Sequence, residues 1–207
     1  MNAQETKKNV RPPFDFKTDT VRSRFISFQE ASTSEVNAAY NRSVDSTFHL
    51  DKNYIFELRL WKRHLSYNFD DVFILRLKNN KWTARYFDLK DSFGDKTKFT
   101  ERKVDQTKAD QLWVKLVENK VLTIPDEKVL QDRLLLYKID SANIDLVIQR
   151  ISMTDGVLYG FELSTPDKKR HFSYSNPESL LKYYGNVEEL YRVVIINMLI
   201  QKFLELQ

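Results

Sequence analysis

Three strand-like segments carry the side chains best suited to binding another molecule. Arg59 and Trp61 alternate with apolar residues in one segment, so both point to the same face of a strand. Arg76 and Arg85 lie before and after a tight turn, on the side of a hairpin away from its apolar residues. Such a face can bind an anion, a glycan or a partner protein, because guanidinium groups make paired hydrogen bonds and aromatic rings anchor interfaces. We name these four as candidate binding residues. The alternative is a salt-bridged face with a helix lying over it.

Two glutamates in the middle of strand-like segments could support hydrolysis. Glu57 and Glu162 would have to lie about 5–9 Å apart on an open face, the separation used in glycoside hydrolysis. The alternative is that each binds a strand arginine. His171 and Ser173 also share a strand face, but no acidic residue that would orient the histidine is identifiable. The sequence therefore predicts no catalytic residue, and we lean toward a protein that is not an enzyme.

Metal and cofactor sites lack the residue patterns that they need. The three histidines, His49, His64 and His171, form no His-x-His pair and no i, i+4 pair. There is no cysteine, which excludes thiolate ligands and disulfides. Four glycines in 207 residues do not provide a phosphate-binding loop, in which backbone amides approach the anion closely. We expect neither a metal nor a cofactor.

The composition is that of an ordinary folded domain. Hydrophobic residues make up 42% of the chain, with 14 Phe and ten Tyr, so a core of this size needs no disulfide or metal. The net charge is +4 with the two signs interspersed, whereas nucleic-acid binding needs basic residues concentrated on one face. No stretch reaches the roughly 20 apolar residues of a membrane-spanning helix. We therefore expect no nucleic-acid partner and no membrane span.

Two dipeptides suited to tight turns predict β-hairpins. Asn79-Asn80 separates the alternating segments 72–77 and 82–89, and asparagine tolerates the positive φ values of a two-residue turn. One face of this hairpin carries apolar residues and is predicted to be buried. The other face, with Ile74 and Arg85, is predicted to be a mixed surface. Asp155-Gly156 predicts a second hairpin that joins 144–153 to 157–164. Pairing across the first turn aligns three pairs on a buried face: Leu77 with Trp82, Leu75 with Ala84, and Phe73 with Tyr86.

Helical spacing and capping residues predict helices at both ends of the chain. The segment 21–28 has helical spacing, and Ser32-x-x-Glu35 is a capping box for a helix that reaches Tyr40. The last helix is apolar on nearly every side, so it has more apolar surface than one contact with the sheet can bury. We expect residues 21–28 to cover the remaining apolar surface, and we therefore favour a monomer over a homodimer. Further helices are predicted at 108–118, from Asn176-Pro177 onward, and at 187–206.

These elements predict an α+β fold with an antiparallel sheet of about five to seven strands built from hairpins. A long C-terminal helix and the N-terminal helices cover the sheet. Residues 1–17 are polar and contain Pro12-Pro13, which favours a flexible tail, and residues 18–207 form a single domain. The segment 121–124 fits a short extended piece, and 127–143 fits either helix or strand.

Several short motifs follow one another in a characteristic order. They are 56–61 (Phe-Glu-Leu-Arg-Leu-Trp), 81–84 (Lys-Trp-Thr-Ala), Trp113 ahead of 122–126, Asp155-Gly156 ahead of Tyr159, and 174–177 (Tyr-Ser-Asn-Pro). This order resembles a group of uncharacterised exported proteins of Bacteroidetes-type bacteria. The resemblance implies export to the periplasm or cell surface and implies no activity. The start contains no signal peptide, although Asn2-Ala3-Gln4 resembles the residues around a signal-peptidase cut. The alternative is a cytoplasmic protein.

The functional hypothesis follows from the lack of a recognisable catalytic or cofactor pattern. We expect an exported, non-catalytic protein that binds a partner protein or a ligand. The alternative is a hydrolase that acts on glycans or peptides through its strand carboxylates. A hydrolase would gather those carboxylates in a concave pocket, whereas a binding protein would expose a patch of aromatic and arginine side chains.

Overall fold

The computed structural model describes residues 38–64, 69–90, 98–102, 104–151, 153 and 155–205. Six strands form one antiparallel sheet in the order β4-β3-β2-β1-β7-β8. With helices packed on it, this is the predicted α+β fold, and the strand number lies in the predicted range. The strands are β1 (Phe56–His64), β2 (Phe69–Lys78), β3 (Lys81–Lys90), β4 (Lys98–Arg102), β7 (Val157–Ser164) and β8 (Lys169–Ser175).

The β2–β3 hairpin confirms the predicted turn and register. Asn79 and Asn80 both have positive φ values, 50° and 59°, as the two central residues of such a turn require. Leu77 pairs with Trp82, Leu75 with Ala84, and Phe73 with Tyr86. Five of these six side chains are buried and Tyr86 is half-buried. Turn chemistry and alternation therefore determine this part of the sheet locally.

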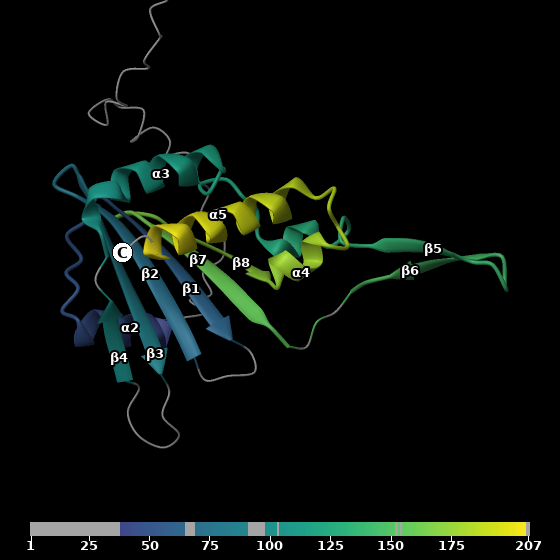
Figure 1. Cartoon of the computed structure of the whole chain (residues 1–207), viewed down its shortest axis with the longest axis horizontal. Helices are drawn as coiled ribbons and strands as arrows, with labels where there is room; N and C mark the ends of the chain where they lie inside the picture. Colours follow the sequence, from purple (N-terminus) through teal and green to yellow (C-terminus); the bar gives the residue numbers. More distant parts are fainter. Residues whose placement is uncertain are drawn as a thin grey trace, which may run out of the picture.

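Two helices cover the face of the sheet that carries these apolar residues (Figure 1). They are α3 (Ala109–Glu118), which follows the 3₁₀ turn η1 (Gln106–Lys108), and α5 (Glu188–Glu205). The indole of Trp82 stacks on that of Trp113 in α3 with 4.5 Å between centroids, and Phe73 meets Phe203 of α5 edge-on at 6.0 Å. The short helix α4 (Pro177–Leu181) precedes α5 and starts at the predicted Asn176-Pro177. These contacts confirm the helices predicted at 108–118 and near 187–206.

The opposite face of the sheet is also covered, which corrects the predicted mixed surface. Helix α2 (Ala38–Thr47) lies against it (Figure 1) and continues beyond Tyr40, where the sequence analysis ended it. Ile74 is only 1% exposed, because the residues packed on this face form a second buried cluster. That cluster comprises Val44, Leu50, Trp61, Val72, Ile74 and Phe87, with Phe48 at its margin. The predicted helix at 21–28 and the capping box lie outside the described residues.

The second predicted hairpin is wrong. Strand β6 (Asp145–Gln149) pairs with β5 (Leu136–Asp140) in a separate two-stranded ribbon, while β7 pairs with β1 and β8. Gly156 instead has a φ of +141° beside the side chain of Asn176. The Oδ1 of Asn176 accepts a hydrogen bond from the backbone N–H of Val157 at 2.7 Å, which ties the end of β8 to the start of β7. The glycine serves this close approach and not a hairpin turn.

The chain between α3 and the ribbon also differs from its predicted course. Residues 121–123 form a turn and not an extended piece, and the carbonyls of Leu122 and Ile124 accept hydrogen bonds from the buried Arg170 of β8. The ambiguous stretch 127–143 contains both structures, the 3₁₀ turn η2 (Glu127–Leu130) and strand β5.

Strand β8 forms one edge of the sheet, and two carboxylates lie along it. Asp126 accepts a hydrogen bond from the backbone N–H of Ser173 at 2.9 Å, and Glu127 accepts one from that of Ser175 at 2.6 Å. Backbone groups that would otherwise face outward are thereby satisfied.

Candidate functional site

The four predicted binding residues lie on one face of the sheet, beneath or beside α2. Arg59 donates to Asp45 of α2 at 2.6 Å. Trp61 is fully buried, and its indole N–H donates to Asn41 Oδ1 at 3.1 Å. The guanidinium of Arg76 lies 5.2 Å from the ring centroid of Tyr54, and that of Arg85 lies 4.9 Å from that of Phe87. This is the salt-bridged, covered face of the alternative interpretation, and binding of an outside molecule by these four residues remains a prediction.

Glu57 is the centre of the charge network on this face. Its side chain is 2% exposed and accepts hydrogen bonds from Arg59, at 2.6 Å, and from Arg76. Arg85 forms a separate paired contact with Glu101 at 2.6 and 2.7 Å. Burial lowers the pKa of Arg59, but the charges of Glu57 and Asp45 outweigh burial and raise that pKa above its ordinary value. Arg59 therefore stays charged, and its positive charge is neutralised within the chain.

Glu57 and Glu162 lie on the same face of neighbouring strands. Arg59 is directly opposite Glu162, and Glu57 is directly opposite Ser164, so the two carboxylates are one diagonal step apart. Asn41 of α2 donates to Glu162 at 2.7 Å. Glu57 is therefore bound by arginines of the same face and Glu162 by a side chain of α2, and neither carboxylate lines the cavity described below.

His171 and Ser173 lie on the edge strand β8, on the same face of the sheet as Glu162. Asp126 accepts hydrogen bonds from the N–H and the hydroxyl of Ser173 at 2.9 and 3.4 Å, and Glu162 lies directly opposite His171 on β7. Burial lowers the pKa of His171 and thus favours its neutral form. In a catalytic triad the acid binds the histidine and the histidine binds the serine, whereas here the acid binds the serine directly.

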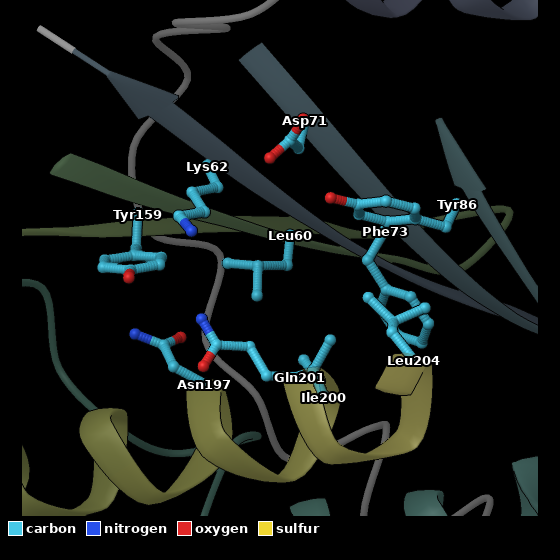
Figure 2. A pocket seen from close by; sticks show the side chains of 10 residues that line it. All are labelled: Leu60, Lys62, Asp71, Phe73, Tyr86, Tyr159, Asn197, Ile200, Gln201 and Leu204. Carbon is cyan, nitrogen blue, oxygen red and sulfur yellow. The ribbon is translucent and has the colours of Figure 1, made fainter. Parts of the chain in front are cut away.

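A cavity lies on the other face of the sheet, between β1, β2, β3, β7 and α5. Figure 2 shows Lys62, Asp71 and Tyr86 on the wall formed by the sheet, and Asn197 and Gln201 rising from α5. Its volume is about 60 Å³. Clefts that hold drug-sized ligands measure roughly 300–1,000 Å³, so this one admits only a small molecule or a few waters. The remaining lining is Leu60, Phe73, Tyr159, Ile200 and Leu204.

The ionisable groups of this cavity are perturbed by burial. Burial raises the pKa of Asp71 above its usual value, and the neighbouring Asp88 carboxylate adds to the rise. Burial also raises the pKa of Tyr86, and so do the charges of Asp71 and Asp88. On the opposite side, burial and the charge of Glu178 raise the pKa of Tyr159. Perturbed groups gathered in a concavity are a common property of functional sites.

Asn197 is the least expected residue of the cavity, because it interrupts the apolar stripe of α5. It is 2% exposed, and its Oδ1 has no hydrogen-bond partner among the described residues. We expect Asn197→Leu to raise the free energy of unfolding by roughly 1 kcal/mol, since it removes a buried unsatisfied acceptor beside a space that can hold the larger side chain. Thermal melts should show a rise of about 2–4 °C. A lower melting temperature would show that the 3.3 Å hydrogen bond from Asn197 to Glu178 outweighs the orphaned oxygen.

Six of the ten exposed large apolar side chains among the described residues belong to the β5–β6 ribbon and its turn. The ribbon extends away from the body of the protein (Figure 1). Tyr137 pairs with Ile148 and Ile139 with Leu146, so all four side chains lie on one face. They are 60%, 57%, 80% and 56% exposed, respectively. The other face carries Leu136, Lys138, Asp140, Asp145, Val147 and Gln149.

The base of the ribbon is attached to the body, and its tip is acidic. The backbone N–H of Ile151 donates to the hydroxyl of Tyr184 at 3.2 Å, and Arg150 donates to the side chain of Gln131 at 3.2 Å. Asp140 and Asp145 stand directly opposite each other next to the turn. A two-stranded ribbon with a bare apolar face is marginally stable in water, and exposed apolar patches of this kind are common at interaction surfaces.

Neither the cavity nor the ribbon is predicted by the sequence, although each has a signal in it. Lys62 and Asp71 stand at positions that continue the apolar alternation of β1 and β2, and Asn197 stands in an apolar run. Polar residues at core positions commonly mark functional sites. The ribbon is not predicted because the sequence of the segment 127–143 fits either a helix or a strand.

Among residues 38–64, 69–90, 98–102, 104–151, 153 and 155–205, no group of three or more metal-ligating side chains is found. No helix in the same part of the chain is both long and apolar enough to cross a membrane. No protein-family model matches the chain, and no curated protein matches it.

Proposed function

We propose that the protein is a non-catalytic, exported protein that binds a partner protein through the apolar face of the β5–β6 ribbon. The observation that carries this proposal is the exposure of Tyr137, Ile139, Leu146 and Ile148 on a single face. Exposed, contiguous apolar surface commonly marks a site of protein interaction, because its burial is favourable by about 25 cal/mol per Å².

The arrangement of charges supports a particular kind of partner. Asp140 and Asp145 face each other across the tip, and like charges directly opposite in a ribbon are unfavourable. A basic group on the partner would relieve this repulsion. The proposed partner therefore offers an apolar groove with a basic residue where the tip of the ribbon ends.

Other features support binding over hydrolysis. The carboxylates of Glu57 and Glu162 are held by Arg59, Arg76 and Asn41, so they are not poised around a substrate site. The proposed unit is a monomer, because α5 buries Leu190, Val193, Ile196, Ile200 and Phe203 of its apolar stripe within the chain. Export rests on the resemblance to exported proteins, and cell fractionation would test it.

Capture experiments with matched serine variants test the proposed surface. Immobilised wild-type protein is expected to retain a specific protein from an envelope extract of the host, and Ile139→Ser with Ile148→Ser is expected to lose it. Because Lys138 and Gln149 lie on the opposite face of the same two strands, Lys138→Ser with Gln149→Ser should retain it.

The four substituted side chains (Ile139, Ile148, Lys138 and Gln149) are exposed, so neither double variant should change the melting temperature appreciably. Equal capture by both double variants would contradict the proposed surface. Sedimentation of the purified protein distinguishes a second copy from a different partner.

A further inference from the structure

The cavity in Figure 2 contains a hydrogen-bonding atom that the described part of the chain leaves without a partner. The amide N–H of Asn197 donates to Glu178 at 3.3 Å, which fixes the orientation of the group, because a carboxylate only accepts. Its Oδ1 is then the free acceptor, and it has no partner among the described residues. Figure 2 shows this side chain directed from α5 toward the sheet. A buried acceptor is unfavourable unless something donates to it.

The opposite wall supplies a positive charge. Lys62 stands on the core face of β1, two residues after Leu60, and extends toward α5 (Figure 2). Lys62 lies directly opposite Asp71 of β2 and its charge opposes the rise in the pKa of that carboxyl group, but within the described residues its ammonium forms no hydrogen bond or salt bridge. An ammonium group is a compact donor that suits a carboxylate. The cavity thus has a free acceptor on one wall and an available cation on the other.

The size and the remaining walls limit what can bind. A volume of about 60 Å³ holds roughly four to six water-sized groups, taking 10–15 Å³ for each. Leu60, Phe73, Ile200 and Leu204 supply apolar contact for a short carbon chain.

We propose that this cavity binds a small organic acid of about six non-hydrogen atoms that carries a hydroxyl or amino group beside its carboxylate. The carboxylate binds Lys62, the hydroxyl or amino group donates to Asn197 Oδ1, and the carbon chain lies against the apolar walls. This site is separate from the ribbon and does not depend on the partner proposed for it. Water alone in the cavity is the competing explanation.

A set of three small acids tests the proposal on the wild-type protein. Lactate and alanine each carry a donor beside the carboxylate, whereas propionate has the same carbon chain without one. In a two-dimensional NMR titration, lactate or alanine should bind saturably and shift the amide signals of β1 and α5. Propionate should bind roughly 2–10-fold more weakly than lactate, which corresponds to the loss of one neutral hydrogen bond.

Variants assign the two contacts. Asn197→Ala should remove the preference over propionate, while Lys62→Met should weaken all three acids. Lys138→Met, on the exposed ribbon, is the matched control and should leave all affinities unchanged.

Two outcomes would overturn the proposal. The first is no saturable shift with any acid up to about 50 mM, which would mean that the cavity holds water only. The second is equal affinity of the wild-type protein for all three acids. This outcome is measured on the wild-type protein alone, so it does not depend on whether a variant folds. A ribbon variant, Ile139→Ser, should bind the acids normally, so that failure here and failure of the proposed function can be distinguished.

Discussion

Replacing Gly156 with alanine is expected to lower the free energy of unfolding by roughly 2–5 kcal/mol. A Cβ at this position would lie 1.7 Å from Asn176 Oδ1, and the φ of +141° is one that other residues rarely adopt. Asn176 is buried and holds the N–H of Val157, so it can move only by breaking that hydrogen bond. Strain and an unsatisfied buried donor would therefore occur together.

Gly185→Ala is the matched control for this substitution. The added Cβ would have its nearest contact at 3.5 Å, with the carbonyl oxygen of Leu181, which is an ordinary van der Waals distance. We expect it to be neutral or to stabilise the protein by about 0.4–1 kcal/mol, because alanine restricts the unfolded chain. Urea unfolding followed by circular dichroism would measure both variants. Equal stability of the two would show that Asn176 moves aside without loss.

The second large effect is expected from Glu57→Gln. This change leaves Arg59 buried and without one of its two carboxylate partners, and the loss should be about 3–5 kcal/mol. It should be visible as a lower midpoint of urea unfolding. Lys78→Met is the control, because its salt bridge with Asp51 is largely exposed and should contribute about 0–1 kcal/mol.

A double variant separates the effect of an unpaired charge from that of the lost contact. Replacing both Glu57 and Arg59 with apolar residues, as Glu57→Leu with Arg59→Met, should recover part of the stability lost by Glu57→Gln, because Arg59 then no longer leaves a poorly paired charge beneath α2. Recovery should be incomplete, since Arg76 also binds Glu57. A double variant that is less stable than Glu57→Gln would contradict this expectation. It would show that the network of Glu57, Arg59 and Arg76 stabilises the fold by other means than the neutralisation of the Arg59 charge.

Local signals predicted those parts of the fold whose partners are near in sequence. Asn79-Asn80 predicted the register of β2 and β3, because a two-residue turn with positive φ values leaves little choice of pairing. The helix α3 followed in the same way from its spacing, with Leu112, Trp113 and Leu116 buried as expected. Each case needed information from fewer than about a dozen residues.

Pairings between distant segments could not be predicted in the same way. Asp155-Gly156 resembles a hairpin turn, but β6 pairs with β5 and the glycine accommodates Asn176, which comes 20 residues later. Likewise, Arg59 and Trp61 were assigned to an interacting face, but nothing in their own strand indicates that α2 covers them. The cavity joins residues of four strands and one helix, so only its misplaced polar residues were visible beforehand.

The two carboxylates along β8 have a consequence for how copies of this chain behave at high concentration. An exposed strand edge is a template on which another molecule can add a strand, and repeated addition builds fibrils. At this edge the N–H groups of Ser173 and Ser175 are already bound by Asp126 and Glu127. An incoming strand would have to displace both carboxylates and bring its own backbone past two negative charges. Aggregation should therefore start elsewhere, and removing these two side chains would open a new route to it.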